Sequence, residues 1–196
     1  MRKVTFGVAN SLDNFIARAD DAVDWLKWTS EVSAITARFW KTIDTVIMGR
    51  RTYDVARKSG TPSYPGVENI VFSRTLKMSP NPKVVLVSDD AVEYVRRLKA
   101  GNGKGVCVMG GGVLANSLLE AGLIDEIGLN IHPVLLGSGI PMFGPMRRQV
   151  DLELKDSKVL KNGCVYLLYR VKRKGERPKV ASRRHARNLS TKKVGA

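Results

Sequence analysis

The chain has 196 residues, enough to bury one hydrophobic core but too few for a second full-sized domain. Hydrophobic residues make up 43% and charged residues 26%, a balance that is typical of a folded globular protein and excludes a disordered chain. No segment offers the roughly 18 consecutive apolar residues of a membrane span, and the amino-terminal residues lack the apolar block of a secretory signal. We therefore expect a cytoplasmic protein without membrane contact.

The formal net charge of +15 is concentrated near the carboxyl end. Residues 170–196 hold 11 Lys and Arg against one acid, Glu176, whereas residues 1–169 carry a net charge of only +5. We expect a folded domain over residues 1–171 and a basic, flexible tail over residues 172–196. Because Lys and Arg bind phosphates, a non-catalytic nucleotide or nucleic-acid binder that uses this tail is one alternative function.

The first half of the sequence alternates between strands and helices. Residues 4–9 form a short apolar run typical of a strand. Apolar residues then recur at helical spacing and predict a helix over a sheet: Trp25, Trp28, Val32, Ile35 and Phe39. Residues 45–48 predict a buried strand that stops at Gly49, and a helix follows from Thr52. After a loop over residues 58–68, residues 69–73 predict another strand.

The second half continues this alternation and then changes. Residues 84–87 and 105–109 predict strands, each followed by a helix, over residues 91–99 and from Gly112 to Leu119. Such alternation predicts a mostly parallel sheet with helices on its faces. Asn162 and Gly163 lie between two strand-like runs, residues 152–160 and 164–171, and predict an antiparallel hairpin. The expected fold class is therefore α/β, with a mixed, mostly parallel central sheet and an antiparallel C-terminal hairpin.

Both cysteines, Cys107 and Cys164, lie alone in apolar runs. Neither belongs to a CxxC motif or pairs with a histidine in the sequence. This placement argues against a disulfide framework and against a zinc site, so we expect two core residues and no metal.

Three strand ends carry residues suited to binding an anion. Glycine lets the backbone approach a ligand closely, and the N–H groups at a helix start attract phosphate. Arginine side chains can hold phosphate oxygens bidentately, and an arginine beyond a strand suits a ribose 2′-phosphate. The three segments are Gly110-Gly111-Gly112, Gly49-Arg50-Arg51-Thr52 and Ser73-Arg74. A tight turn and surface arginines are the alternative interpretation, since neither GxGxxG nor a P-loop is present.

Six segments in order resemble successive motifs of the dihydrofolate-reductase-like superfamily. They are residues 11–17, 46–53, 69–74, 110–114, 122–127 and 132–139. The resemblance is greatest to the C-terminal reductase domain of the riboflavin-biosynthesis deaminase/reductase, in a stand-alone sub-branch, and spans residues 3–171. It implies a three-layer α/β/α fold with an eight-stranded sheet, NADPH as the hydride donor, and often a homodimer.

By motif position, the resemblance also implies the cofactor contacts. Ala9, Asn10 and Ile16 would flank the nicotinamide, and Ser73 with Arg74 would meet the adenosine 2′-phosphate. The diphosphate would be held by Gly49, Arg50, Arg51, Thr52, Gly110, Gly111, Gly112, Val113 and Leu114. The implied activity is NADPH-dependent reduction of a small C=O or C=N substrate.

The substrate is left open by two departures from the family pattern SLDGKIA. Asn14 replaces the glycine, and Asn tolerates a left-handed turn. Phe15 replaces a lysine suited to a substrate phosphate. A ribosylaminopyrimidine phosphate of the riboflavin pathway is one possible substrate, another small molecule is a second, and dihydrofolate reductase activity is a further alternative.

Reduction also needs a proton for the heteroatom. Asp13, in the loop after the first strand, and Asp24, at the start of the expected Trp25 helix, are the candidate catalytic acids. Each has a structural alternative, because Asp13 suits a turn and Asp24 suits the first turn of a helix. His132, before a proline at a strand end, is expected to be structural.

Overall fold

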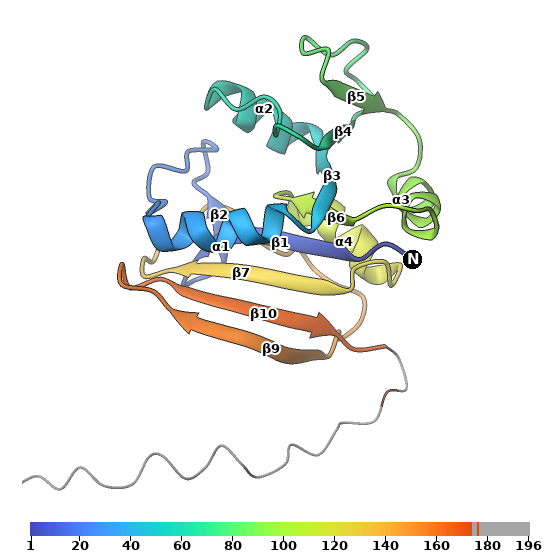
Figure 1. Ribbon diagram of the computed structural model, residues 1–196. Helices are drawn as coiled ribbons and strands as arrows, with labels where there is room; N and C mark the ends of the chain where they lie inside the picture. Colours follow the sequence, from blue (N-terminus) through green and yellow to red (C-terminus); the bar gives the residue numbers. More distant parts are fainter. Residues whose placement is uncertain (174–175, 177–196) are drawn as a thin grey trace, which may run out of the picture.

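The computed structural model describes residues 1–173 and 176, and an eight-stranded sheet forms its centre (Figure 1). The strands of this sheet are β1 (Val4–Ser11), β3 (Ile43–Gly49), β4 (Glu68–Phe72), β5 (Val84–Val87), β6 (Gly105–Met109), β7 (Glu126–His132), β9 (Leu152–Val159) and β10 (Val165–Val171). The helices are α1 (Ser30–Trp40), α2 (Arg50–Lys58), α3 (Ala91–Ala100) and α4 (Gly112–Glu120). The expected basic tail, residues 172–196, lies outside the described residues except for residues 172, 173 and 176.

The strand order is β5-β4-β3-β6-β1-β7-β10-β9. The first six strands of this order pair in parallel, whereas β10 is antiparallel to both β7 and β9. The predicted fold class is confirmed: the sheet is mixed and mostly parallel, and it ends in an antiparallel hairpin. Gly163, with a φ of 83°, lies in the turn of that hairpin, where a left-handed conformation is required.

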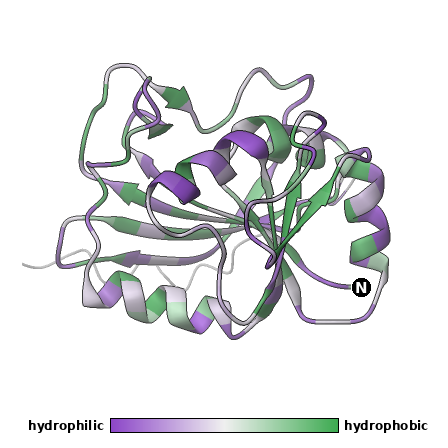
Figure 2. Ribbon diagram, turned by 90° about the horizontal axis from the view of Figure 1, so that it is seen from above, coloured by the Kyte–Doolittle hydropathy of each residue, from purple (hydrophilic) through white to green (hydrophobic). Residues whose placement is uncertain are grey.

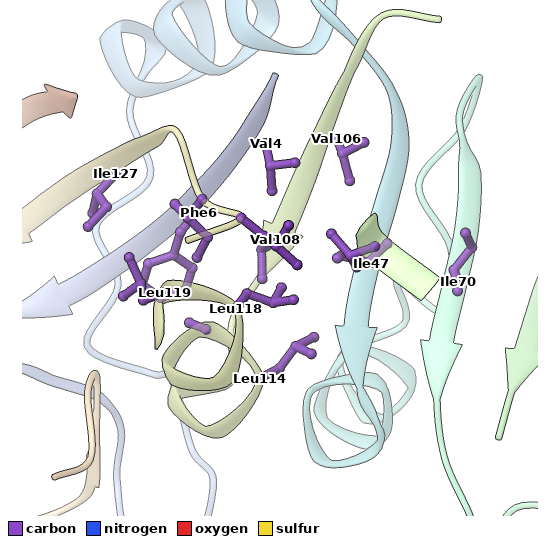
Figure 3. Close-up of a cluster of buried hydrophobic side chains, with 14 of the residues drawn as sticks. Val4, Phe6, Ile47, Ile70, Val106, Val108, Leu114, Leu118, Leu119 and Ile127 are labelled. Carbon is purple, nitrogen blue, oxygen red and sulfur yellow. The ribbon is translucent and has the colours of Figure 1, made fainter. Parts of the chain in front are cut away.

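Helices α3 and α4 cover one face of the sheet. Figure 3 shows Leu118 and Leu119 of α4 on the side of the helix that faces Val108 of β6 and Phe6 of β1. Leu118 and Phe6 are fully buried. Burying a side chain of this size contributes about 1.5–3 kcal/mol to stability, so this cluster holds α4 firmly at the end of β6.

Helices α1 and α2 cover the opposite face, which completes the three layers (Figure 2). Tyr53 of α2 is fully buried in a cluster with Met48 and Val71 of the sheet. Trp40 of α1 packs against the same cluster and stacks on Tyr64, with ring centroids 5.1 Å apart. Cys107 is buried in this cluster, where burial raises the pKa of its thiol to about 12, and Cys164 is buried too.

The helix expected to include Trp25 and Trp28 begins later, at Ser30. Thr29 accepts a hydrogen bond from the Val32 backbone N–H through its side chain and so fixes the helix start. Trp28 is 68% exposed, so the prediction of a core position for it was wrong. Trp25 is buried, but it packs from a loop, edge-on against the ring of His132.

Other element bounds differ by smaller amounts. β1 continues to Ser11, two residues beyond the predicted end, and α2 begins at Arg50 rather than Thr52. A two-stranded antiparallel sheet of β2 (Phe15–Ala17) and β8 (Ile140–Pro141) was not predicted. Within residues 1–173 and 176, the helices are too short or too polar for a membrane crossing.

Candidate functional site

Four neighbouring parallel strands bring the predicted cofactor residues to one edge of the sheet. In the order β4-β3-β6-β1, these strands lead into Ser73, Gly49, Gly110 and Asn10 at their carboxyl ends. Carboxyl ends of parallel strands are where ligands of open α/β sheets bind. The three anion-suited segments, which are far apart in the sequence, therefore lie on adjacent strands.

Thr52 joins two of these segments directly. A Cβ atom added to Gly110 would lie 2.7 Å from Thr52 Cγ2, and one added to Gly111 would lie 3.2 Å from Thr52 Oγ1. Gly110 and Gly111 have φ values of 56° and 62°, a left-handed conformation that favours glycine. The turn after β6 therefore requires glycine for two reasons: its backbone is left-handed, and Thr52 leaves no room for a side chain.

The helices at this edge differ from the other two at their amino ends. Thr29 and Asp90 cap α1 and α3 through their side chains. In contrast, α2 begins after Gly49 and α4 after Gly111, and neither glycine provides a side-chain cap. The first N–H groups of α2 and α4 are thus left to an external acceptor, together with the positive ends of the helix dipoles.

The arginines at this edge are not equivalent. The Nε of Arg50 lies 2.7 Å from a carboxylate oxygen of Asp54, and the Nε of Arg51 lies 2.7 Å from one of Asp21. Arg74 is exposed and has no ion-pair partner among residues 1–173 and 176. The guanidinium of Arg74 is therefore more available to a ligand phosphate than those of Arg50 and Arg51.

Ser73 lies next to Arg74 and is 8% exposed. Its hydroxyl oxygen accepts a hydrogen bond from the Leu76 backbone N–H over 2.9 Å, which shapes the turn after β4. The hydroxyl group of Ser73 can still donate its own proton, because the bond from Leu76 occupies only a lone pair of the oxygen.

Residues 112–114 contribute backbone and not side-chain groups to the edge. The Leu114 side chain is buried in the core with α4, and Val113 is 85% exposed. A Cβ on Gly112 would lie 2.5 Å from the Met142 carbonyl oxygen, so this position admits only glycine. Any ligand contact from these residues would therefore use the N–H groups at the start of α4.

The segment after β1 is tied to the same edge. Asn14 has a φ of 66°, which confirms that it takes the left-handed turn predicted for it. Its carbonyl accepts a hydrogen bond from the Met142 N–H over 2.8 Å. Asn10 is fully buried, and its Oδ1 has no hydrogen-bond partner among the described residues. Ala9 and Ile16 are both partly buried near this segment.

Asp13 accepts three hydrogen bonds that join two loops. Ser11 Oγ donates to Asp13 Oδ1 over 2.6 Å, and the backbone N–H groups of Leu136 and Gly137 donate over 3.1 and 2.8 Å. The Ser11 hydrogen bond, followed by the two backbone bonds, lowers the pKa of the Asp13 carboxyl below its usual value. This environment favours a charged acceptor that positions the loop after β1.

Asp24 is exposed and forms a two-point ion pair with Arg18. The two distances are 2.7 Å from Arg18 Nε and 3.1 Å from Arg18 Nη2. The hydrogen bond from Arg18 lowers the pKa of Asp24. Asp24 precedes α1 by several residues and so does not occupy the helix turn expected for it.

A group of buried polar atoms near the end of β7 was missed by the sequence analysis. Trp25 Nε1, Asn130 Oδ1 and His132 Nε2 have no hydrogen-bond partner among the described residues. Asn130 pairs with Ala9 in the sheet, so the group lies beside β1. Burial lowers the pKa of His132, which keeps its ring neutral near pH 7. In the sequence, the polar residues at alternate positions of β7, Asn130 and His132, could have indicated this group.

A cavity of about 750 Å³ opens at the opposite, amino end of the sheet. Its lining includes the ion pairs Lys99–Asp125 and Lys3–Glu126. Lys99 Nζ also donates to the Leu123 carbonyl, so this basic group already has protein partners. The cavity lies away from the glycine turns and is not part of the candidate site.

The layers, the strand order and the glycine turns define an α/β protein of the dihydrofolate-reductase-like fold. The chain belongs to the RibD C-terminal domain family, whose model matches residues 2–166. The suspected family is thereby confirmed.

Two relatives are similar in sequence. The uncharacterised protein YwjB of Bacillus subtilis (strain 168) is 34% identical over 160 residues, covering 80% of this chain and 91% of YwjB. A crystal structure from Shewanella sp. PV-4, provisionally named a riboflavin biosynthesis protein, is 28% identical with a TM-score of 0.76. That alignment covers 88% of this chain and 100% of the Shewanella chain.

A dihydrofolate reductase shares the fold at lower identity. The Enterococcus faecalis enzyme, solved in complex with NADP(H), is 20% identical with a TM-score of 0.64. The alignment covers 87% of this chain and 97% of the enzyme. At this identity the likeness concerns the fold alone.

Proposed function

We propose that the protein is an NADPH-dependent reductase that transfers hydride to a C=O or C=N bond of a small substrate. The observation that carries the proposal is the pair of uncapped helix N-termini on adjacent strand ends, with Arg74 beside them. A diphosphate needs several N–H donors within one small region, and α2 and α4 supply them from two sides. Membership of the RibD C-terminal domain family supports the same activity.

Each group of residues has a separate role in this proposal. The N–H groups of residues 49–52 and 110–114 bind the diphosphate, and Ser73 with Arg74 binds the 2′-phosphate. Residues 9, 10 and 16 would lie against the nicotinamide, since they belong to β1 and to β2 directly after it. NADPH supplies the hydride when it is bound, and the protein contributes orientation and a suitable electrostatic environment.

Asp13 and Asp24 are the proposed catalytic residues, as charged hydrogen-bond acceptors and not as proton donors. Both carboxyls have a lowered pKa and are held by hydrogen-bond donors, so at neutral pH each holds a negative charge and not a proton. Asp13, which lies in the loop directly after β1, is the better placed to orient a substrate by accepting a hydrogen bond. A proton from water could complete the reduction.

A ribosylaminopyrimidine phosphate of the riboflavin pathway is the proposed substrate class. The family match and the provisional name of the Shewanella relative support it. Phe15 stands where the family pattern has a lysine suited to the substrate phosphate. Dihydrofolate is therefore the comparison substrate, because it carries no phosphate that a lysine at this position would bind.

Titration of the protein's tryptophan fluorescence with NADPH tests the proposal. We expect saturable quenching by NADPH and weaker binding of NADH. NADPH oxidation is then followed with the ribosylaminopyrimidine phosphate and, separately, with dihydrofolate. The absence of NADPH binding would contradict the reductase proposal. Faster turnover of dihydrofolate would keep the reductase and replace the substrate.

A further inference from the structure

Three buried polar groups near the carboxyl end of β7 have unused hydrogen-bonding capacity. Trp25 Nε1, Asn130 Oδ1 and His132 Nε2 make no hydrogen bond within the described part of the chain. Trp25 is 8% exposed and His132 is 2% exposed, so bulk solvent does not reach these atoms. Buried polar groups without a partner are destabilising, and they occur where a ligand or an ordered water completes them.

The three groups meet on the face of the sheet that α1 covers. Leu129 of β7 packs into the cluster under α4, so the alternation of side chains places Asn130 and His132 on the opposite face. The Trp25 ring, from the loop before α1, packs edge-on against the His132 ring, with ring centroids 5.2 Å apart. Asn130 and His132 are separated along the strand by about 6.6 Å, which leaves one small region between them and the indole.

This region adjoins the residues proposed for the nicotinamide. In the pairing of β1 with β7, Asn130 lies opposite Ala9 and His132 lies opposite Ser11. Paired residues direct their side chains to the same face, and neighbouring strands are about 4.8 Å apart. Ser11 in turn donates a hydrogen bond to Asp13. A molecule bound to the three groups would therefore lie beside both the nicotinamide and Asp13.

The hydrogen-bonding character of the group is defined. The Trp25 indole N–H is a donor only, and Asn130 Oδ1 is an acceptor. His132 Nδ1 lies 3.1 Å from the Asn130 carbonyl oxygen, so Nδ1 carries the proton of that bond and Nε2 of the neutral ring is an acceptor. The Lys27 backbone also lies near this ring, but Nε2 makes no hydrogen bond to it. The group thus offers one donor, two acceptors and no charge.

Only some chemical groups complement this set. A ring edge in which N–H groups flank a carbonyl supplies one acceptor and two donors, and cyclic amides and cyclic ureides have such an edge. A phosphate or a carboxylate supplies acceptors alone, so its oxygens would face the lone pairs of Asn130 and His132 without a proton between them. The set therefore selects an uncharged nitrogen heterocycle and rejects an anion.

The loop that covers the group is held weakly at its outer side. Residues 18–28 connect β2 to α1 and cover the group through the Trp25 ring. Arg51 Nε lies 2.7 Å from Asp21 Oδ1 in a partly exposed ion pair, and Asn162 Nδ2 donates to the Lys27 carbonyl over 3.4 Å. Exposed ion pairs and long hydrogen bonds contribute little to stability. The loop can therefore move aside for a ligand at a small cost in free energy.

We propose that Trp25, Asn130 and His132 form a specificity-determining subsite for an uncharged heterocycle with a cyclic amide or ureide edge. This assignment rests on the proposed reductase function, which places the nicotinamide beside the subsite. The indole N–H donates to the ring carbonyl, and Asn130 with His132 accepts from the two ring N–H groups. The subsite selects the ring and not a substrate phosphate, in agreement with Phe15 at the position of the family lysine.

A pair of ligands tests the proposed edge. The probe 5,6-diaminouracil has a ring carbonyl between two N–H groups, and its analogue methylated at both ring nitrogens keeps the carbonyl and lacks both donors. In calorimetric titration of the full chain, free and with NADP⁺ present, we expect the analogue to bind roughly tenfold or more weakly than the probe. Equal affinities, or no binding of the probe in either condition, would overturn the subsite.

The Trp25→Phe variant tests the donor. It keeps an aromatic ring against His132 and removes only the N–H group, so the affinity for diaminouracil should fall roughly tenfold. Trp28→Phe is the matched control in the same loop, because the Trp28 ring is 68% exposed. The control should bind the probe within about threefold of the wild type. Equal affinities of the two variants would overturn the role of Trp25.

Thermal unfolding separates ligand binding from a structural role. The removed N–H group has no partner in the free protein, so Trp25→Phe should unfold at the wild-type temperature or above it. An indole that only holds an ordered water predicts the opposite, a lower unfolding temperature with unchanged affinity for the probe. That result would overturn the proposal.

The cofactor titration distinguishes this proposal from the proposed function. Trp25→Phe should bind NADPH within about threefold of the wild type, since the indole lies on the substrate side. A wild type that binds NADPH but not diaminouracil would overturn the subsite alone. A wild type that binds diaminouracil through Trp25 but does not bind NADPH would support the subsite and contradict the reductase.

Discussion

Thr52 lies against Gly110, so that a Cβ at position 110 would come within 2.7 Å of Thr52 Cγ2. This contact fixes the start of α2 against the turn between β6 and α4. Both helices consequently direct their uncapped amino ends toward one region of the sheet edge. The relative placement of these two ends is what makes a shared phosphate site possible.

Gly110→Ala should therefore reduce NADPH affinity. The substitution introduces the contact with Thr52 and strains a backbone with a φ of 56°. We expect a loss of about 1–2 kcal/mol in folding free energy from the backbone alone, and at least a roughly tenfold loss of NADPH affinity, equivalent to about 1.4 kcal/mol. Equilibrium unfolding and fluorescence titration measure the two effects.

Gly122→Ala is the matched control for the Gly110 variant. Gly122 has a φ of 69°, but a Cβ there would meet nothing within 4 Å. This variant should lose similar stability from backbone strain and keep its NADPH affinity. Equal affinity losses in the two variants would show that strain, and not the Thr52 contact, governs binding.

Gly49→Asp should stabilise the protein and weaken cofactor binding at once. Gly49 already has the extended conformation of an N-cap, and a Cβ there would meet nothing within 4 Å. An aspartate could cap α2 as Asp90 caps α3, which adds a few tenths of a kcal/mol to about 1 kcal/mol. The same carboxylate would compete with the diphosphate, so we expect a roughly tenfold or greater loss of NADPH affinity.

Gly49→Ala separates these effects because it adds a Cβ without a cap or a charge. We expect NADPH affinity within about threefold of the wild type for this variant. Thermal unfolding and NADPH titration of both variants are required. A Gly49→Asp protein that binds NADPH as tightly as Gly49→Ala would place the diphosphate elsewhere.

Arg74→Ala should discriminate between the two nicotinamide cofactors. A charged hydrogen bond to a phosphate contributes about 1.5–3 kcal/mol, so NADPH affinity should fall by roughly tenfold or more. NADH lacks the 2′-phosphate and should bind the variant and the wild type about equally. Arg96→Ala, which removes an exposed arginine paired with Glu93 on α3, is the control. Parallel losses for NADPH and NADH would argue against the 2′-phosphate contact.

Asp13→Asn should lower stability at neutral pH. The Asp13 carboxylate accepts hydrogen bonds from Ser11, Leu136 and Gly137, and an amide accepts them less strongly. The folded protein lowers the pKa of Asp13 below its ordinary value of 3.8. The stabilisation is therefore fully present above that ordinary value and is lost as the pH falls through the lowered pKa.

Urea unfolding of the wild type and of Asp13→Asn over an acidic pH series tests this linkage. The stability difference between the two proteins should be constant near neutrality and should shrink as the pH falls below 3.8. A difference that stays constant across the whole series would show that the charge of Asp13 does not contribute. A large loss of turnover with unchanged stability would instead favour the catalytic role.

The local signals were strong for β4, β5 and β6, because these strands are short, largely apolar and bounded by turn residues. The turn at Asn162 and Gly163 set the hairpin, and the glycines at 110–112 marked the start of α4, whereas α2 begins two residues before the predicted Thr52. Sequence analysis could not place β1 between β6 and β7, since strand order depends on contacts between distant segments. The resemblance to a known family supplied the number of strands.

The region before α1 shows where the spacing of apolar residues gives a wrong helix prediction. Trp25 and Trp28 continue the helical spacing of Val32 by coincidence, but Thr29 caps the helix and ends the pattern. The pair β2 and β8 has three and two residues, too few for a periodicity to be seen. The backbone partners of Asp13, Leu136 and Gly137, were also hidden, because they lie in a loop that meets Asp13 only in the folded chain.

The structure of the protein with NADPH bound is the most direct test of the proposed function. The account predicts one cofactor molecule that touches Gly49, Gly111 and Arg74, with its diphosphate between the starts of α2 and α4. A cofactor bound away from these strand ends, or one that reaches only a single one of them, would contradict it.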